Sequence, residues 1–210
     1  VRAVTENIKL IGIVLGAIVL IAAGISGYKY YRQEGISSAK SRINAILSKQ
    51  DPQERLQAME KYLPQAPRRF RGGLRLELAN LCMEQDRYEK AAEVWGQLAQ
   101  NTSDREVEAI AGLGRAKALR LSGQGEKALE VLRDLSDSVP EAFQKSVYYE
   151  IAVASEEKQD WERALSAYEQ LRSQTELGGE QGGFYRYKIA RLRNKIAESE
   201  RNQTNKDSSS

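Results

Sequence analysis

The sequence predicts an all-α protein with one N-terminal transmembrane helix, a helix-turn-helix solenoid and a C-terminal capping helix. Three observations predict it. An uncharged apolar run extends from Leu10 to Tyr28. Further along, an alanine-centred pattern recurs three times at a period of 36 to 37 residues, as in repeat proteins. Only 4 prolines occur in 210 residues, so long helical stretches remain between a few breaks.

Composition limits the function. The chain is 41% hydrophobic and 29% charged, as expected of a folded domain, and its 32 basic and 29 acidic residues leave a net charge of only +3. This balance disfavours a dedicated nucleic-acid binder. The absence of histidine excludes histidine-based catalysis and histidine-ligated metals. Cys82, the one cysteine, allows neither an internal disulfide nor a cysteine cluster, and it fits a small core residue better than a nucleophile. We therefore expect no enzyme activity, no cofactor and no metal.

Residues 1–35 are predicted to hold a flank and a single membrane anchor, with residues 8–31 in contact with lipid. The 19 residues from Leu10 to Tyr28 carry no charge, and about 20 such residues cross a ~30 Å hydrocarbon layer as a helix. Lys9 precedes the run, and tyrosines and cations follow it, as at a membrane interface. The alternative is a cleaved signal peptide. The run is longer than the usual ~7–15-residue core of such a peptide, and no convincing cleavage site follows it, which favours an anchor.

The residues leave two alternatives for the orientation of this anchor in the membrane, and two for whether it pairs with another helix. The far flank is the more basic one, which by the positive-inside rule keeps the following domain in the cytoplasm. The printed chain begins with Val1 rather than Met, however, so the near flank cannot be counted safely. Gly12 and Gly16 form a G-x-x-x-G step that allows two spanning helices to pair into a homo-oligomer, although glycine is also simply common in such helices.

Three repeats are predicted over residues 68–177. Ala79, Ala116 and Ala152 are 37 and 36 residues apart, and another alanine follows each of them after 12 residues. Small residues let paired helices cross closely, while large residues beside them fill the space between repeats. The pattern predicts helices over 72–84 and 87–100, 105–121 and 125–137, and 141–157 and 161–173. With the segments that flank them, we expect a right-handed superhelix from about residue 36 to 197.

Shorter segments flank the repeats. Residues 36–67 are expected to form a degenerate first repeat, in which Asp51 caps a helix that begins with Pro52. After the glycine-rich break at 178–183, apolar residues at helical spacing predict a capping helix within 178–198, because the last repeat of a stack must cover its apolar face. Residues 199–210 are expected to be a disordered tail.

The repeats resemble tetratricopeptide repeats (TPRs), although Gly125 stands where an aromatic residue is usual. The whole layout resembles a narrower family. The resemblance rests on the tyrosines and the arginine that follow the apolar run and on three sequence stretches. These are Gly-Gly-Leu-Arg-Leu-Glu-Leu-Ala at 72–79, Tyr-Glu-Lys-Ala-Ala at 88–92 and Tyr-Lys-Ile-Ala-Arg-Leu at 187–192. Together these are similar to the bacterial ancillary subunit of the SecYEG translocon, the YfgM-like family. The resemblance implies a single-pass protein of the bacterial inner membrane whose repeats face the periplasm. It also implies association with the SecYEG translocon, with exported or periplasmic proteins and with chaperones.

The TPR pattern also predicts a protein-binding surface, because the first helices of the repeats line the concave face of such a stack. Apolar and charged side chains mix there, as in a groove for a peptide, although solvated surface positions would show the same mixture. The predicted function is a membrane-anchored interaction module at the translocon; the alternative is a scaffold for a different membrane complex. The predicted binding residues are Asn80, Met83, Glu84, Lys117, Arg120, Tyr149 and Glu156.

Overall fold

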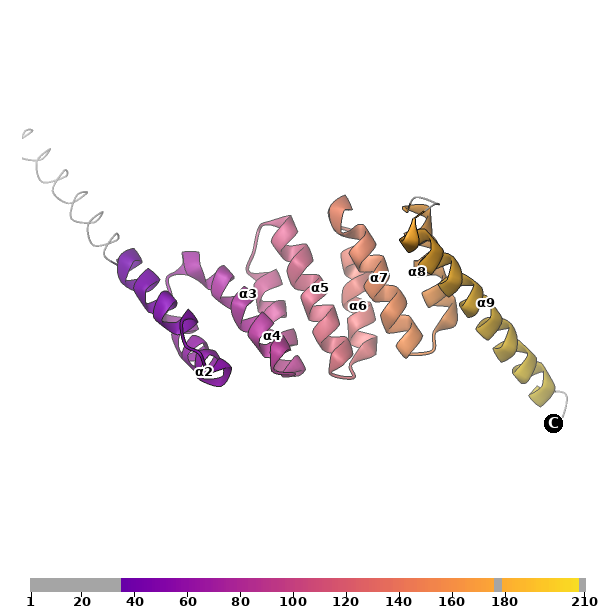
Figure 1. Ribbon diagram of the computed structural model, residues 1–210, viewed down its shortest axis with the longest axis horizontal. Coiled ribbons are helices and arrows are strands. Elements are labelled where there is room, and N and C mark those ends of the chain that lie inside the picture. The colour runs from indigo at the N-terminus through magenta and orange to yellow at the C-terminus, as the bar shows by residue number, and fades with distance from the viewer. Residues whose placement is uncertain (1–34, 176–178, 208–210) are drawn as a thin grey trace, which may run out of the picture. The chain divides into compact units, whose positions relative to one another are not determined.

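The computed structural model describes residues 35–175 and 179–207, and in this part of the chain all regular structure is helical (Figure 1). The chain divides into two compact units, the first ending at Pro67 and the second beginning at Arg68. The predicted span at residues 8–31 lies outside the described residues. Among the helices that the structure describes, none is long and apolar enough to cross a membrane.

The first unit contains a helical segment at 35–47, helix α2 (Pro52–Tyr62) and the 3₁₀ turn η1 (Leu63–Gln65). The side chain of Asp51 accepts a hydrogen bond from the Gln53 backbone N–H at 2.9 Å, and Pro52 opens the helix, as predicted. Ala66 is extended, the conformation that a residue before proline prefers.

A small core holds this unit together. The Arg42 guanidinium lies 5.5 Å from the centre of the Tyr62 ring and so links the segment at 35–47 to α2. The buried apolar residues of the unit are Ala39, Ile46, Leu56, Met59, Tyr62 and Ala66.

The second unit is a succession of helix pairs. Its helices are α3 (Arg68–Glu84), α4 (Tyr88–Gln100), α5 (Arg105–Leu121), α6 (Gly125–Ser136), α7 (Glu141–Glu157), α8 (Trp161–Ser173) and α9 (Glu180–Asp207). Each packs against the next along the chain, and α5 also contacts α7 (Figure 1). The predicted helix bounds are close to these, except that α3 begins at Arg68 and runs through Gly72 and Gly73, where the sequence predicted its start.

The close crossings fall where the repeat pattern predicts them. Ala91, Ala128 and Ala164 are fully buried, as are the first alanines of the three repeats. Trp95, Leu132 and Tyr168, four residues after the second alanines, are buried as well. The pattern of small and large residues therefore reports helix packing, and the predicted TPR-like arrangement is confirmed.

The turn inside each pair has the same backbone geometry three times. Asp86, Gly123 and Gln159 have φ values of 56°, 79° and 60°. The backbone N–H of the residue after each donates to the carbonyl five positions earlier, at distances of 2.8 to 2.9 Å. This bond pattern with a left-handed residue is the Schellman motif, which ends a helix and satisfies its last carbonyls.

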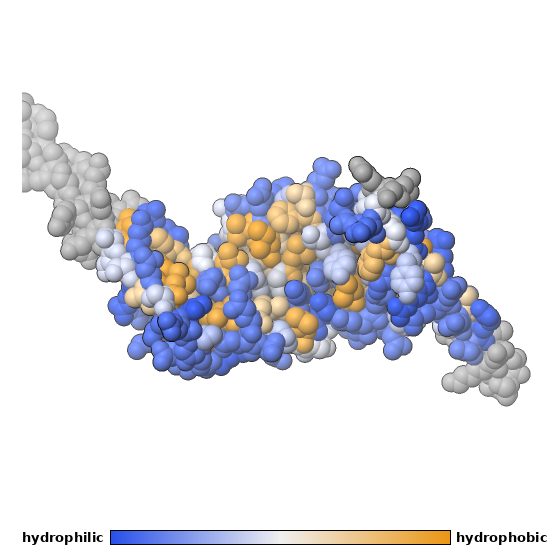
Figure 2. All heavy atoms as spheres, in the orientation of Figure 1, coloured by the Kyte–Doolittle hydropathy of each residue, from blue (hydrophilic) through white to orange (hydrophobic). Residues whose placement is uncertain are grey.

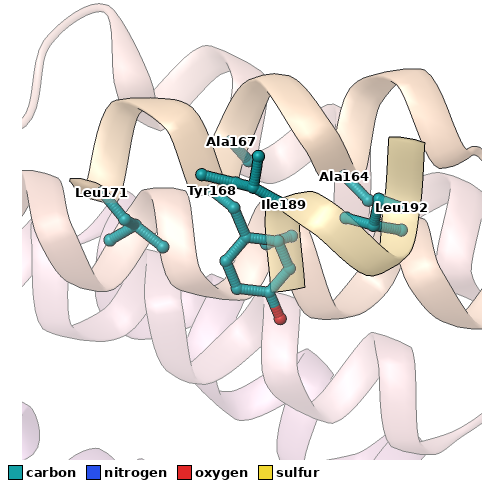
Figure 3. Close-up of a cluster of buried hydrophobic side chains, with 7 residues drawn as sticks. Ala164, Ala167, Tyr168, Leu171, Ile189 and Leu192 are labelled. Atoms are coloured by element: carbon teal, nitrogen blue, oxygen red, sulfur yellow. The ribbon is translucent and has the colours of Figure 1, made fainter. Parts of the chain in front are cut away.

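Helix α9 covers the end of the stack, as predicted. Ile189 and Leu192 are buried in one cluster with Tyr168 and Leu171 of α8 (Figure 3). The predicted disordered tail from residue 199 is corrected, because α9 continues to Asp207. Residues 197–207 contain neither glycine nor proline and several good helix formers, so the sequence does not stop the helix there.

Candidate protein-binding groove

The first helices of the repeats, α3, α5 and α7, lie side by side with α9 on one face of the second unit (Figure 1). We call this the first-helix face. Each of the three repeat helices carries an exposed large apolar side chain, since Leu76 on α3, Ile110 on α5 and Tyr149 on α7 are 39%, 42% and 43% exposed. Figure 2 shows hydrophobic side chains gathered over the middle of this unit. Exposed apolar surface of this kind is typical of an interaction site.

A groove of about 440 Å³ opens on this face between α5, α7 and α9. Helix α5 contributes a partly apolar wall, α7 contributes a mixed wall, and α9 closes the third side. Because the three helices come from two repeats and the cap, the groove exists only in the stacked arrangement. Its lining consists of Leu113, Gly114 and Lys117, then Lys145, Ser146, Tyr149 and Glu150, and finally Gln181 and Tyr185.

Of the predicted binding residues, the structure brings Lys117 and Tyr149 together in this groove. Asn80, Met83 and Glu84 belong to α3 and do not line it. Asn80 and Glu84 are exposed, and Met83 is half-buried.

Arg120 serves a different purpose, because it links two repeats. Its side chain is only 13% exposed, and one terminal nitrogen lies 2.6 Å from Glu157 Oε1 on α7. Its Nε lies 3.4 Å from Glu150 Oε2, a charge contact without hydrogen-bond geometry. A guanidinium held in this way joins α5 to α7 and is already occupied by internal partners.

Glu156 has a similar internal role between α7 and the cap. Its Oε2 accepts a hydrogen bond from Lys188 Nζ at 2.6 Å and one from the Tyr168 hydroxyl at 3.3 Å. Lys188 also lies 5.4 Å from the centre of the Tyr168 ring. Burial, together with the nearby Glu156 carboxylate, raises the pKa of Tyr168 well above its usual range. The network thus keeps Tyr168 neutral and fixes α9 on the stack.

Sequence reasoning missed part of the lining. Gln181 and Tyr185 were overlooked because the cap was given only a covering role, and Lys145 because the repeat pattern marked other positions of its helix. One signal was available, since Lys145 precedes Tyr149 by one helical turn and so shares its face. Burial and the neighbouring Tyr149 raise the pKa of Tyr185, which therefore stays a neutral phenol in neutral solution.

The groove contains the means for binding and lacks a reactive group. Cys82 is fully buried, as predicted. Among the described residues, no cluster of three or more carboxylate or thiol side chains could hold a metal ion.

A second hollow of about 390 Å³ lies between α6, α7 and α8 and is lined by Glu126, Leu129, Glu130, Arg133, Ser136, Ile151 and Arg163. We regard it as the rival binding site.

These features define a TPR-like protein-interaction domain with protein partners. Comparison with protein families agrees with the structure, because the family described as "Tetratricopeptide repeat-like domain" matches residues 4–194. The chain belongs to this family, the YfgM-like family of the resemblance, and the TPR scaffold points to a non-enzymatic protein. Comparisons with curated proteins and with solved structures gave no significant match.

Proposed function

We propose that the protein is a membrane-anchored TPR module that associates with the SecYEG translocon and assists exported proteins or periplasmic chaperones. The observation that carries the proposal is the groove on the first-helix face, where Lys117 and Tyr149 from consecutive repeats meet. A tyrosine offers contact area with a polar tip, and a lysine offers a charge, so together they suit a protein segment.

The apolar run from Leu10 to Tyr28 supports the membrane part of the proposal. An anchor confines the module to two dimensions and raises its effective concentration near other membrane proteins. Weak groove affinity for each client is then sufficient. We therefore propose two separate contributions, with residues 8–31 promoting association with the translocon and the groove holding client segments.

We propose the bacterial inner membrane as the location, with the repeats in the periplasm. The family resemblance supports this orientation, and long domains are translocated with limited regard to flanking charge. Protease added to intact spheroplasts should digest residues 36–210. Full protection of these residues in spheroplasts, with digestion after lysis, would place the repeats in the cytoplasm.

Affinity purification of the full chain from solubilised membranes tests the translocon part. SecYEG subunits should be enriched relative to a purification of an unrelated single-span protein of equal abundance. Replacing residues 8–31 with an unrelated span should reduce this enrichment. If SecYEG is recovered no better than with the unrelated protein, the proposed function is wrong.

A second function is favoured by one observation. The basic far flank, with Lys29, Arg32, Lys40 and Arg42, suits a cytoplasmic domain. In that orientation the same module would be a scaffold for a different membrane complex. The spheroplast experiment and the identities of the co-purified subunits separate the two functions.

A further inference from the structure

We propose that the groove between α5, α7 and α9 binds an acidic peptide segment that carries one aromatic or large aliphatic side chain, and that α9 is a wall of this binding site. The inference deepens the proposed function and rests on it, because it names the chemistry of the segments that the module would hold. Three features of the groove support it: a positive charge, apolar contact area and a third wall from α9.

The charge available in the groove is positive. Lys117 and Lys145 are exposed, and neither forms an ion pair with any residue in the part of the chain that the structure describes. Glu150 is the one carboxylate in the lining. Its side chain is 17% exposed and faces Arg120, which it shares with Glu157, so the two lysines leave the lining with a net positive charge. Two uncompensated lysines attract carboxylates from a partner and disfavour basic segments.

Besides the two lysines, the lining of the groove offers apolar contact area. Tyr149 and Tyr185 lie close enough for Tyr149 to affect the pKa of Tyr185, and Leu113 contributes aliphatic surface from α5. Gly114 lets the Trp95 ring pack directly against α5, because a Cβ at this position would lie 2.5 Å from that ring. The missing side chain thus permits the close crossing of α4 and α5, and the apolar contact area for a partner side chain comes from Leu113, Tyr149 and Tyr185.

One wall of the groove comes from the capping helix α9 and not from a repeat. Gln181 and Tyr185 close the groove from the cap. The position of this wall is fixed by Ile189 and Leu192 in the core and by the 2.6 Å ion pair between Lys188 and Glu156. Changes on the exposed part of α9 should therefore alter binding without disturbing the stack.

The test measures binding of fluorescein-labelled peptides to the purified full chain by fluorescence anisotropy, with detergent present. The probe is a nine-residue peptide with the core Asp-Glu-Phe-Glu-Asp between glycine-serine flanks. Two comparison peptides carry Lys-Arg-Phe-Arg-Lys or Asp-Glu-Ser-Glu-Asp instead. We expect the acidic phenylalanine peptide to bind best, and its affinity to fall as salt is raised, because the attraction is between exposed charges.

Charge reversal locates the site. Lys117→Glu with Lys145→Glu should weaken binding of the acidic phenylalanine peptide by roughly tenfold or more. The matched control is Lys90→Glu with Lys127→Glu, which makes the same change of net charge on α4 and α6. Tyr149→Ala should weaken the phenylalanine peptide and have little effect on the serine peptide. Equal losses in the two lysine pairs would mean attraction by net charge alone and would overturn the proposal.

The wall of α9 is tested by the exposed Gln181. Gln181→Glu should weaken the acidic peptide and Gln181→Lys should strengthen it, each by about threefold, whereas Gln170→Glu on α8 should change nothing. Equal responses at 181 and 170 would contradict the role of α9. Displacement of the peptide by polyphosphate, with no effect of Tyr149→Ala, would make the groove a general polyanion surface and overturn the peptide assignment. Absence of peptide binding with intact recovery of SecYEG would refute this inference and leave the proposed function standing.

Discussion

Single residues with left-handed backbone set the turns of the repeats. Asp86, Gly123 and Gln159 occupy equivalent positions with positive φ. Only Gly123 is a glycine, the residue that the left-handed conformation favours. This conformation costs a residue with a side chain about 1–2 kcal/mol, whereas for glycine the cost is mainly conformational entropy of about 0.5–1 kcal/mol. The turn at Gln159 is therefore less stable than it could be.

We predict that Gln159→Gly raises the free energy of unfolding of the repeats by up to about 1 kcal/mol, and that Gly123→Ala lowers it by a similar amount. Urea unfolding of the full chain, followed by circular dichroism, measures both. A loss of stability with Gln159→Gly would contradict the assigned turn geometry.

Arg120 is predicted to act on stability. Arg120→Ala leaves the largely buried Glu150 carboxylate without its nearby cation, and we expect a loss of about 1–3 kcal/mol. Adding Glu150→Gln should recover part of this loss, since it removes the uncompensated charge. The same unfolding measurement applies, with the exposed Arg172→Ala as control. If Arg120→Ala is as harmless as the control, the link between the repeats is not a stabilising contact.

Residue roles were the least predictable part of the site. The repeat pattern indicates which side of a first helix faces its neighbours, and two of the residues it singles out, Lys117 and Tyr149, line the groove. It gives no information on partners far along the chain. Arg120 pairs with Glu157, 37 residues away, and Glu156 with Lys188, 32 residues away. These contacts depend on how repeats stack, which no local motif records.

Helix packing was predictable because it depends on a repeated small residue. Ala128 is fully buried in α6, which packs against α5 and α7. Ala128→Trp should lower the free energy of unfolding by about 1–3 kcal/mol or more, since a close crossing has no room for an indole. Ala91→Trp and Ala164→Trp should behave alike, and the exposed Lys127→Trp is the control. Unchanged melting temperatures in all three buried variants would mean that the repeat alignment is wrong.

The capping helix is predicted to stabilise the whole stack. Leu192 is fully buried against α8, and Leu192→Ala should cost about 2–5 kcal/mol through lost burial and the cavity left behind. Arg191→Ala, an exposed change on the same turn, should stay within about 0.5 kcal/mol. Thermal unfolding compares the two, and equal melting temperatures would show that α9 does not cover the stack.

The ends of helices were predicted well where a turn residue marks them and poorly elsewhere. The bounds of α5, α7 and α8 agree with the sequence because glycine, proline or a capping aspartate stands beside them. The end of α9 was missed because a polar segment was equated with disorder. The start of α3 was missed because Gly72 and Gly73 were given the role of a break, yet both lie inside the helix with open space around them.

At the scale of the whole molecule, an all-α stack of TPR-like pairs was predictable from periodicity and composition alone. The groove between α5, α7 and α9 was not predictable from the sequence, because its third wall comes from a segment outside the repeat pattern. The anchor at residues 8–31 stays a prediction. Recovery of a mature chain from the soluble fraction, beginning after Gly27, would contradict it.

The central claim is that the first-helix face is where this protein holds its partners. A photoreactive amino acid at position 149, introduced into the full chain in living cells, tests it most directly against the same group at Glu130 in the rival hollow. The claim predicts crosslinks to other proteins from position 149, their loss when Lys117→Glu and Lys145→Glu are added, and few crosslinks from position 130. Crosslinks mainly from position 130, or crosslinks from 149 that ignore the two lysine changes, would contradict it.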